Sequence, residues 1–384
     1  MLGIKGKVYL VGGAVRDELL ELPCHERDWV VVGSTPEEML AAGFRQADPE
    51  FPVFLHPQTG EEYALARRER KIGAGYRGFA VDASPGITLH EDLQRRDLTI
   101  NAIARGEDGQ LIDPFDGQGD LAAGRLRHIS PAFAEDPLRL LRLARFAAKL
   151  GGLGFRLAHS THKLIKQMVA DGAVAELLPQ RIGREMNKAL ACEQPWRFFE
   201  VLNACNALQI LVPGLAQQLS DAGHGNLQAG HPIKALQRAC VSSEDPAVRF
   251  AALFLSTADE AKRIDEQLVP GTQAIGLLTA ARDSMQVVND DFRAETLFTL
   301  LQRQRAWQRG GRFEQVLEVI AAQPGARRAE ESLRAACVAG MAIGSEQLMA
   351  KGFKGAELGQ AIAQARVAAI ASVIEQQPGN VTAQ

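Results

Sequence analysis

The stretch that decides the fold is VGGAVRD at residues 11–17. The apolar run over residues 7–11 predicts a strand, the paired glycines predict a turn, and residues 14–22 suit a helix. Because neither glycine has a side chain, the backbone of the turn can approach a bulky anion such as a triphosphate. Taken alone, such a turn is more often simple punctuation between two elements, so its meaning depends on the residues that follow.

The next stretch brings two carboxylates to the start of a second strand. Glu26 and Asp28 stand two residues apart at the head of the apolar run over residues 29–32. Alternate residues of a strand point the same way, so both carboxylates are expected on one face. Mg²⁺ commonly takes one or two carboxylates together with substrate phosphates. A phosphate turn beside a carboxylate pair favours a site for nucleotidyl transfer, although each piece alone is more typical of ordinary surface structure.

Composition excludes several classes of protein. The chain has 384 residues, of which 46% are hydrophobic and 23% charged, as in a globular protein of two to four domains. No run of eighteen apolar residues occurs, so we expect no membrane partner and a cytoplasmic location. Five scattered cysteines form no CxxC pair and indicate neither a disulfide framework nor a zinc site. The net charge of -3 argues against a generally basic surface but leaves room for a local basic face.

The periodicity changes character along the chain. Up to about residue 121, short strands alternate with short helices; further strands are expected over residues 53–56, 63–66 and 111–112. Thr35-Pro36 opens a helix with a capping residue and a proline. The basic, glycine-rich segment between Arg67 and Phe79 is predicted to be a mobile loop. From about Pro131 onward the pattern is helical. The sequence therefore predicts a mixed α/β head followed by an all-α remainder.

Three further clusters carry charged residues in suggestive patterns. Residues 95–102 read RRDLTINA, in which one arginine is expected to meet a triphosphate while Asp97 and Asn101 fix the local geometry. Residues 113–121 form a turn-rich stretch with two glycines, which is either a plain connector or a hinge. Residues 135–146 predict a helix with an apolar stripe and arginines at every third position: Arg139, Arg142 and Arg145.

The start of this last helix allows two interpretations. Asp136 precedes Pro137, which is a standard helix opening in which the carboxylate caps the first turn. Alternatively, Asp136 and Arg139 read the edge of a base, because a carboxylate accepts from the amino group of C or A and a guanidinium donates to ring acceptors. Three arginines on the same helix need anions or bases to face.

Together these motifs resemble those of bacterial tRNA nucleotidyltransferases, the CCA-adding enzymes. The order GGAVRD, Glu26-x-Asp28, RRD, the 113–121 stretch and Glu135-Asp136-x-x-Arg139 is that of the family, and residues 178–185 are similar to the motif that braces its template helix. The resemblance implies addition of C, C and A to the 3′ end of tRNA from CTP and ATP. It implies these roles: Glu26 and Asp28 as ligands of Mg²⁺, Gly13, Arg16, Arg96, Arg142 and Arg145 in the nucleotide pocket, and Asp136 and Arg139 as the base-reading pair.

The resemblance also implies a domain plan and two departures from the family. The expected parts are a head over 1–125, a neck over 126–195, a body over 196–320 and a tail over 321–384. The first carboxylate is Glu26, where the family pattern usually has aspartate. Many members also carry a phosphohydrolase domain with an adjacent His-Asp pair, and the matching position here reads Leu255-Ser256. We therefore expect that second activity to be absent. The segment from Arg67 to Gly78 is expected to help the switch from C to A.

Two rival functions stay open at this point. A poly(A) polymerase shares the head, but such enzymes usually have a basic C-terminal extension, whereas this sequence closes on EQQPGNVTAQ. A non-catalytic RNA-binding relative is disfavoured because both carboxylates are present. The sequence leaves open the oligomeric state and whether CCA, CC or A alone is added.

Overall fold

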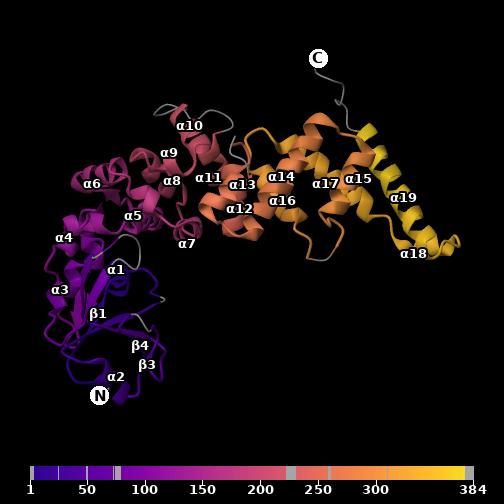
Figure 1. Cartoon of the computed structure of the whole chain (residues 1–384). Helices are drawn as coiled ribbons and strands as arrows, with labels where there is room; N and C mark the ends of the chain where they lie inside the picture. Colours follow the sequence, from indigo (N-terminus) through magenta and orange to yellow (C-terminus); the bar gives the residue numbers. More distant parts are fainter. Residues whose placement is uncertain are drawn as a thin grey trace. The chain divides into compact units, whose positions relative to one another are not determined.

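The computed structural model describes residues 4–24, 26–48, 51–71, 73, 79–221, 231–257, 261–308 and 310–376. These residues form two compact units, one made of residues 1–185 and 197–207 and the other of residues 186–196 and 208–384. Strands occur in the first part of the chain and helices alone after it, as Figure 1 shows along the colour scale. The predicted fold class, an α/β head followed by an all-α region, is confirmed.

A mixed seven-stranded sheet forms the centre of the head, in the order β3-β4-β5-β2-β1-β8-β9. Its strands are β1 (Lys7–Val11), β2 (Asp28–Val32), β3 (Arg45–Gln46), β4 (Val53–Leu55), β5 (Glu62–Leu65), β8 (Ala104–Gly106) and β9 (Leu111–Ile112). The β1 strand is antiparallel to both neighbours, and β2 runs parallel to β5. Trp29 and Tyr63 pair across β2 and β5, with ring centroids 5.6 Å apart.

The register of this sheet brings the two decisive stretches together. In the antiparallel β1–β2 pair, Val11 lies opposite Asp28, so the last residue of one strand faces the first residue of the other. The glycine turn that follows Val11 therefore lies at the same edge of the sheet as the carboxylate of β2. Apolar residues from both strands hold this register, because Leu10, Val11, Val30 and Val31 are buried.

Short helices cover the sheet. In order they are α1 (Gly13–Leu19), α2 (Pro36–Ala41), α3 (Leu89–Gln94) and α4 (Gly117–Ala122), with the single-turn 3₁₀ helix η1 (Thr99–Asn101). The predicted start of α2 is confirmed: Thr35 and Glu38 form a capping box, and Pro36 occupies the first helical position. Ala14 and Val15 of α1 pack with Leu10 and Ile103 in one cluster of the core.

Two segments differ from the sequence prediction. The stretch from Arg67 to Phe79 was expected to be a loop, but β6 (Arg68–Lys71) and β7 (Phe79–Asp82) form an antiparallel pair. All four residues of β6 are charged, so the alternation of apolar and polar residues that marks a strand is missing from its sequence. Residues 72 and 74–78 of the predicted loop lie outside the described residues. The 113–121 stretch contains α4, whose first turn is capped by Asp113 through hydrogen bonds from the Gly117 and Gln118 N–H groups at 2.7 and 2.8 Å.

The helices that follow the sheet begin with the long helix predicted from the arginine repeat. After β10 (Arg125–Leu126) and η2 (Pro131–Glu135) come α5 (Leu138–Leu150), η3 (Gly151–Leu153), β11 (Arg156–Leu157), α6 (His159–Ala170), η4 (Ala173–Glu176), α7 (Pro179–Leu190) and α8 (Trp196–Ala204). Four residues of the expected apolar stripe of α5 are buried, Leu141, Leu143, Phe146 and Leu150, whereas Leu138 is half-buried.

The second unit is helical throughout its described residues. Its helices are α9 (Ala207–Leu211), α10 (Pro213–Asp221), α11 (Pro232–Ser242), α12 (Pro246–Phe254), α13 (Ala261–Leu268), α14 (Thr272–Asp290), α15 (Ala294–Arg303), α16 (Phe313–Ala321), α17 (Arg327–Met341), α18 (Ser345–Ala350) and α19 (Gly355–Gln376). The α12 helix is buried from Ala247 to Phe254 and packs against α11, α14 and α16. Its buried Arg249 donates to the carbonyl of Leu190, the last residue of α7, at 2.7 Å and to that of Cys192 at 3.1 Å.

Among the described residues, no helix has both the length and the apolar character needed to span a bilayer. The two compact units do not correspond to the four predicted parts, since the first unit takes in the predicted head and most of the neck. The four-part division stays a prediction.

Candidate active site

Gly12 shapes the turn at the edge of the sheet. Its φ of 72° and ψ of −130° lie in a region that residues with a side chain rarely adopt. A Cβ atom at this position would also stand 2.9 Å from Nη1 of Arg96. The turn therefore requires glycine at residue 12 for two reasons, and it places Arg96 directly beside the backbone that follows β1.

The two predicted carboxylates lie at this same edge. Asp28 is the first residue of β2, whereas Glu26 precedes the strand, so strand alternation does not govern their relative direction as was expected. Both side chains are exposed. Desolvation by the surrounding protein raises the pKa of Asp28; Arg96 and Arg142 lower it, and the charge of Glu26 raises it.

These interactions define what the edge can hold. Glu26 and Asp28 repel one another as like charges, and a cation bound between them would relieve that repulsion. Carboxylate oxygens are the donors that Mg²⁺ and similar hard cations prefer. The described residues contain no cluster of three or more metal-ligating side chains. The donor set thus fits a divalent cation that takes its remaining ligands from substrate and water.

Arg16 lies beneath the turn and is buried. Only 3% of it is exposed, and its guanidinium bonds to Asp17 at 2.7 Å and to Oδ1 of Asn101 at 2.6 Å. A Cβ on Gly13 would lie 3.5 Å from Nη2 of Arg16. Arg16 thus supports the turn from the protein side, and its predicted contact with a triphosphate stays a prediction.

A line of ion pairs and hydrogen bonds to the buried carboxylates of Asp17 and Asp97 continues from Arg16 to α5. Asp17 also accepts from Lys149 at 2.8 Å, and Asn101 donates to Asp97 at 3.0 Å, as expected for a pair that fixes local geometry. Asp97 in turn accepts from Nε of Arg142 at 2.7 Å. Burial would raise the pKa of Asp97, but the Arg142 charge and three hydrogen bonds lower it to about 2.

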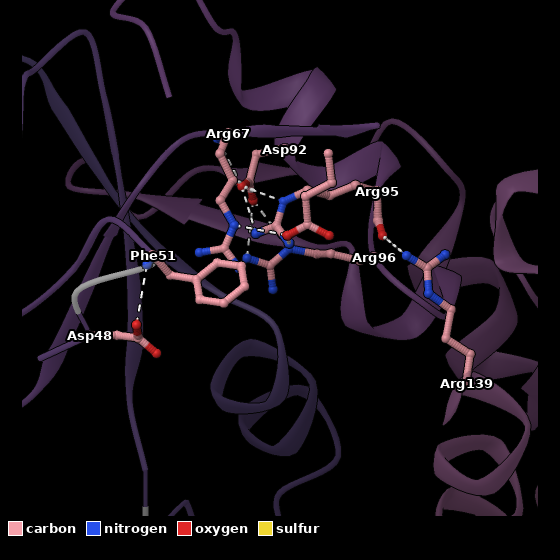
Figure 2. A network of polar contacts seen from close by, with 8 residues as sticks. Asp48, Phe51, Arg67, Asp92, Arg95, Arg96 and Arg139 are labelled. Carbon is pink, nitrogen blue, oxygen red and sulfur yellow. Dashed lines mark hydrogen bonds and ion pairs between the residues drawn. The ribbon is translucent and has the colours of Figure 1, made fainter. Parts of the chain in front are cut away.

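The adjacent arginines at 95 and 96 share one buried carboxylate. Asp92 has no exposed surface and pairs with Arg95 at 2.9 Å and Arg96 at 3.2 Å. Burial raises the pKa of Asp92, but the two arginine charges and their hydrogen bonds lower it overall. Arg95 also pairs with Glu69 of β6 at 2.9 Å. Figure 2 shows Arg67, Arg95 and Arg96 gathered around Asp92.

At the start of α5, Asp136 acts as a helix cap. Its Oδ1 accepts from the Leu138 N–H at 3.0 Å, and its backbone is extended while Pro137 is already helical. The same oxygen lies 3.6 Å from Nη1 of Arg181 on α7. The capping interpretation is therefore realised here, and the base-reading role stays a prediction alongside it.

Arg139 is held by main-chain atoms. Its Nη2 donates to the Arg95 carbonyl at 2.7 Å and its Nη1 to the Ala132 carbonyl at 3.1 Å, the first of which is visible in Figure 2. The residue is only partly buried. These bonds use two of the five N–H groups of a guanidinium and fix its plane.

Asp136 and Arg139 line one cavity of about 260 Å³. The rest of its lining comes from Asp48, Phe51, Val53, Arg67 and Glu69. The Arg67 guanidinium lies over the Phe51 ring, with Cζ 5.2 Å from the ring centroid, as Figure 2 shows. An aromatic ring with carboxylates and guanidinium groups around it can stack on a planar base and bond to its edge.

The two remaining arginines of α5 face carboxylates of the protein itself. Arg142 pairs with Asp97, and Arg145 pairs with Glu185 of α7 at 2.6 Å. The anions that the arginine repeat requires are thus supplied partly from within. Glu185 of α7 pairs with Arg145 of α5, and Arg181 of α7 lies 3.6 Å from Asp136, just before α5 begins. These contacts agree with the expectation that residues 178–185 brace this helix.

Several residues of the site were not identified from the sequence. Asp92 stands in an acidic pair whose role was not assigned, and Phe51 and Glu69 carry no motif at all. Lys149, in the last turn of α5, was not singled out either. Glu69 and Lys149 meet partners 26 and 132 positions away, at Arg95 and Asp17, so no local signal marks them. Asp92 pairs with the nearby Arg95 and Arg96, and what the sequence does not reveal is its burial.

Two protein-family models match this chain, one in the α/β head and one in the helical region that follows it. Residues 8–127 match the family model described as the poly A polymerase head domain. Residues 154–219 match that of the probable RNA and SrmB-binding site of polymerase A. A multifunctional CCA protein of Thioalkalivibrio sulfidiphilus is 44% identical over 401 residues, which cover 95% of this chain and 98% of that relative. The chain belongs to the bacterial CCA-adding enzymes.

Solved structures of CCA-adding enzymes share the fold at low identity. The Bacillus stearothermophilus CCA-adding enzyme in complex with CTP aligns with a TM-score of 0.64 at 24% identity, covering 96% of this chain and 93% of that one. The Thermotoga maritima CCA-adding enzyme complexed with tRNA aligns with a TM-score of 0.64 at 22% identity, covering 96% and 90%. Nucleotidyltransferases of this family generally use a divalent metal, in keeping with the donor set at Asp28.

Proposed function

We propose that this chain adds C, C and then A to the 3′ end of tRNA, using CTP and ATP and releasing pyrophosphate, in the cytoplasm. The observation that carries the proposal is the meeting of Gly12, Asp28 and Arg96 at one edge of the sheet. A backbone turn without side chains, an exposed carboxylate and a guanidinium suit the triphosphate of an incoming nucleotide. Similarity over nearly the full chain to a multifunctional CCA protein supports this function over that of a poly(A) polymerase.

Glu26 and Asp28 would hold Mg²⁺ in this proposal. Bound there, the metal would favour deprotonation of the primer 3′-hydroxyl and neutralise charge on the pyrophosphate. The chain's own residues position the nucleotide. The Gly13 backbone and Arg96 would contact the phosphates, while Arg16 supports the turn from below. Arg142 and Arg145 would complete the nucleotide pocket. Arg142 bonds to Asp97, and 38% of its side chain remains exposed.

Base choice would lie with Asp136 and Arg139. The carboxylate can only accept hydrogen bonds, so it suits the amino groups of C and A and disfavours the carbonyl oxygens of U and G at the same place. The N–H groups of Arg139 that the two carbonyls leave free would donate to ring acceptors. The β6 strand reaches this cavity through Glu69, which supports a contribution of the segment from Arg67 to Gly78 to the switch from C to A.

The experiment that tests this function is incubation of the purified protein with tRNA lacking its 3′ CCA, with CTP and ATP, followed by sequencing of the product ends. We expect ends that stop after C, C and A. Long adenosine tails would indicate a poly(A) polymerase, and unchanged ends would indicate a non-catalytic RNA-binding protein. An Asp28→Ala variant in the same assay controls for a contaminating enzyme.

We also propose that the chain lacks the phosphohydrolase activity found in many relatives. Where the His-Asp pair is expected, the chain has Leu255 and Ser256, which supply neither imidazole nor carboxylate. Both follow the buried helix α12, and the Ser256 carbonyl accepts from Gln218 at 2.8 Å. The test is hydrolysis of 2′,3′-cyclic nucleotides with added divalent metals. No release above the metal blank is expected, and metal-stimulated turnover by the pure protein would refute the proposal.

A further inference from the structure

A second cavity lies on the first unit, away from the residues assigned to catalysis. It has a volume of about 690 Å³ and is lined by the parallel strands β10 and β11 and by the first residues of α6. We call it the β10–β11 groove. Its lining includes Arg125, Arg127, Arg156 and His159 and contains no acidic residue.

Two of these arginines face one another. Arg125 on β10 lies opposite Arg156 on β11 in the strand register, so both side chains project from the same face of the two-stranded sheet. Both are exposed, and within the described ranges neither has an ion pair or a hydrogen bond from its guanidinium. The next residue of β10, Leu126, is fully buried on the other face, so the side chain of Arg125 points away from the core. Like charges on neighbouring strands repel one another, and an anion bound between them would relieve that repulsion.

The backbone around the groove suits a close-lying anion. Gly154 has a φ of 85° and open space where a side chain would stand. Helix α6 has twelve residues, and its first turn receives no hydrogen bond from a capping side chain, because the capping residue is Ala158. Its N-terminal N–H groups therefore add partial positive charge to a face already made basic by the arginines. Arg127 is the exception in this set, since it pairs with the buried Asp120 at 2.9 Å.

We propose that the β10–β11 groove binds backbone phosphates of the tRNA substrate, with Arg125 and Arg156 as the contacting residues. This inference rests on the proposed function for the identity of the RNA. Charge complementarity supports a polyanion, and the matched RNA-binding family segment begins at residue 154, inside the groove. Phosphate contacts of this kind fix the position of a nucleic acid without reading its bases.

The test compares single and double alanine variants at Arg125 and Arg156 with the wild type. Binding of tRNA lacking CCA is measured by filter retention across a series of salt concentrations, without nucleotide. We expect the double variant to bind roughly tenfold or more weakly at about 0.1 M salt, and the slope of log affinity against log salt to fall by about one per arginine. Arg125→Lys with Arg156→Lys should restore most of the salt dependence, because charge is retained.

Two controls separate binding from folding. Arg45→Ala removes an exposed arginine from another two-residue strand, β3, and should leave tRNA affinity unchanged. The thermal midpoint of the double variant should equal or exceed that of the wild type, since two facing charges are removed. A lower midpoint together with unchanged tRNA affinity would assign these arginines a structural role and overturn the proposal.

A free nucleotide offers the same phosphate chemistry, so CTP affinity is measured in parallel. A loss of CTP affinity with unchanged tRNA affinity would overturn the proposal in favour of a nucleotide site. Because RNA binding is measured without catalysis, the result is independent of whether the wild type adds CCA. A wild type that binds tRNA through the groove but adds no nucleotide would refute the proposed function and leave this inference standing.

Discussion

Replacing Asp97 by asparagine should lower the free energy of unfolding of the first unit by about 2 kcal/mol. Asp97 is 6% exposed and accepts three hydrogen bonds, from Arg142, Asn101 and the Leu98 N–H, at 2.7, 3.0 and 2.9 Å. Its pKa is lowered from 3.8 to about 2. Each pKa unit corresponds to about 1.4 kcal/mol of preference for the charged form, so the native environment favours the carboxylate by about 2 kcal/mol.

The lowered pKa of Asp97 determines the pH range over which its carboxylate stabilises the fold. Because the folded-state pKa lies below that of the unfolded chain, the stabilisation is fully present above about pH 4 and is lost as the pH falls towards about 2. Asparagine does not titrate, so the difference between wild type and variant should shrink over the same range. Arg142 keeps 38% of its side chain exposed, which holds the cost below the 3–5 kcal/mol of breaking a fully buried pair.

Hydrogen exchange of the β1 and β2 amides measures this quantity, since these strands lie in the core of the first unit. Exchange at pH 7 should show an opening free energy lower by about 2 kcal/mol in Asp97→Asn than in wild type. The matched Asp108→Asn variant, at an exposed turn, should show no difference. Acid unfolding, followed by circular dichroism, measures how the difference in stability between wild type and variant changes with pH. Equal stability at pH 7, or an undiminished difference near pH 3, would refute the ion-pair account.

Three further predictions concern chemistry at the site. Asp28→Ala should abolish nucleotide addition with the fold intact, because it removes the strand carboxylate that would hold the metal; normal turnover at saturating Mg²⁺ in a tRNA-extension assay would contradict this. Glu26→Asp should be tolerated and Glu26→Gln should not, since only the amide removes the charge; equal rates for Gln and wild type would make Glu26 structural. Asp136→Asn should keep its melting temperature, because asparagine caps a helix comparably, yet lose about 1–3 kcal/mol of discrimination and begin to incorporate UTP. Strict selection for C and A by that variant would leave Asp136 as a cap alone.

Features set by local sequence were predictable, and those set by distant partners were not. The strands β1, β2, β4, β5 and β9 and the helix α5 followed from apolar patterning, and the cap of α2 followed from Thr35-Pro36. By contrast, β6 consists of charged residues, so its pairing with β7 left no trace in hydropathy. Patterning records which face is buried, and a strand with no buried apolar face gives no such signal.

The candidate site shows the same division. Residues 12, 26, 28 and 96 could be proposed from the motifs, and register then explained why Asp28 meets the glycine turn. The ion pairs of Arg142 and Arg145 could not be foreseen, because a helical repeat reveals that arginines share a side of the helix but not which carboxylates they meet. The same limit applies to Asp136, whose capping bond is local while its pairing with Arg181 is not.

The two main-chain acceptors of Arg139 have a consequence for how this protein can change over generations. Every amino acid carries a carbonyl, so substitutions at residues 95 and 132 leave both acceptors in place provided that the backbone keeps its path. The orientation of the guanidinium is thereby insulated from drift in its immediate neighbours. Side chains around this arginine can therefore be exchanged without turning its guanidinium, whereas a shift of the backbone between α3 and η1 would move the Arg95 acceptor and with it the guanidinium.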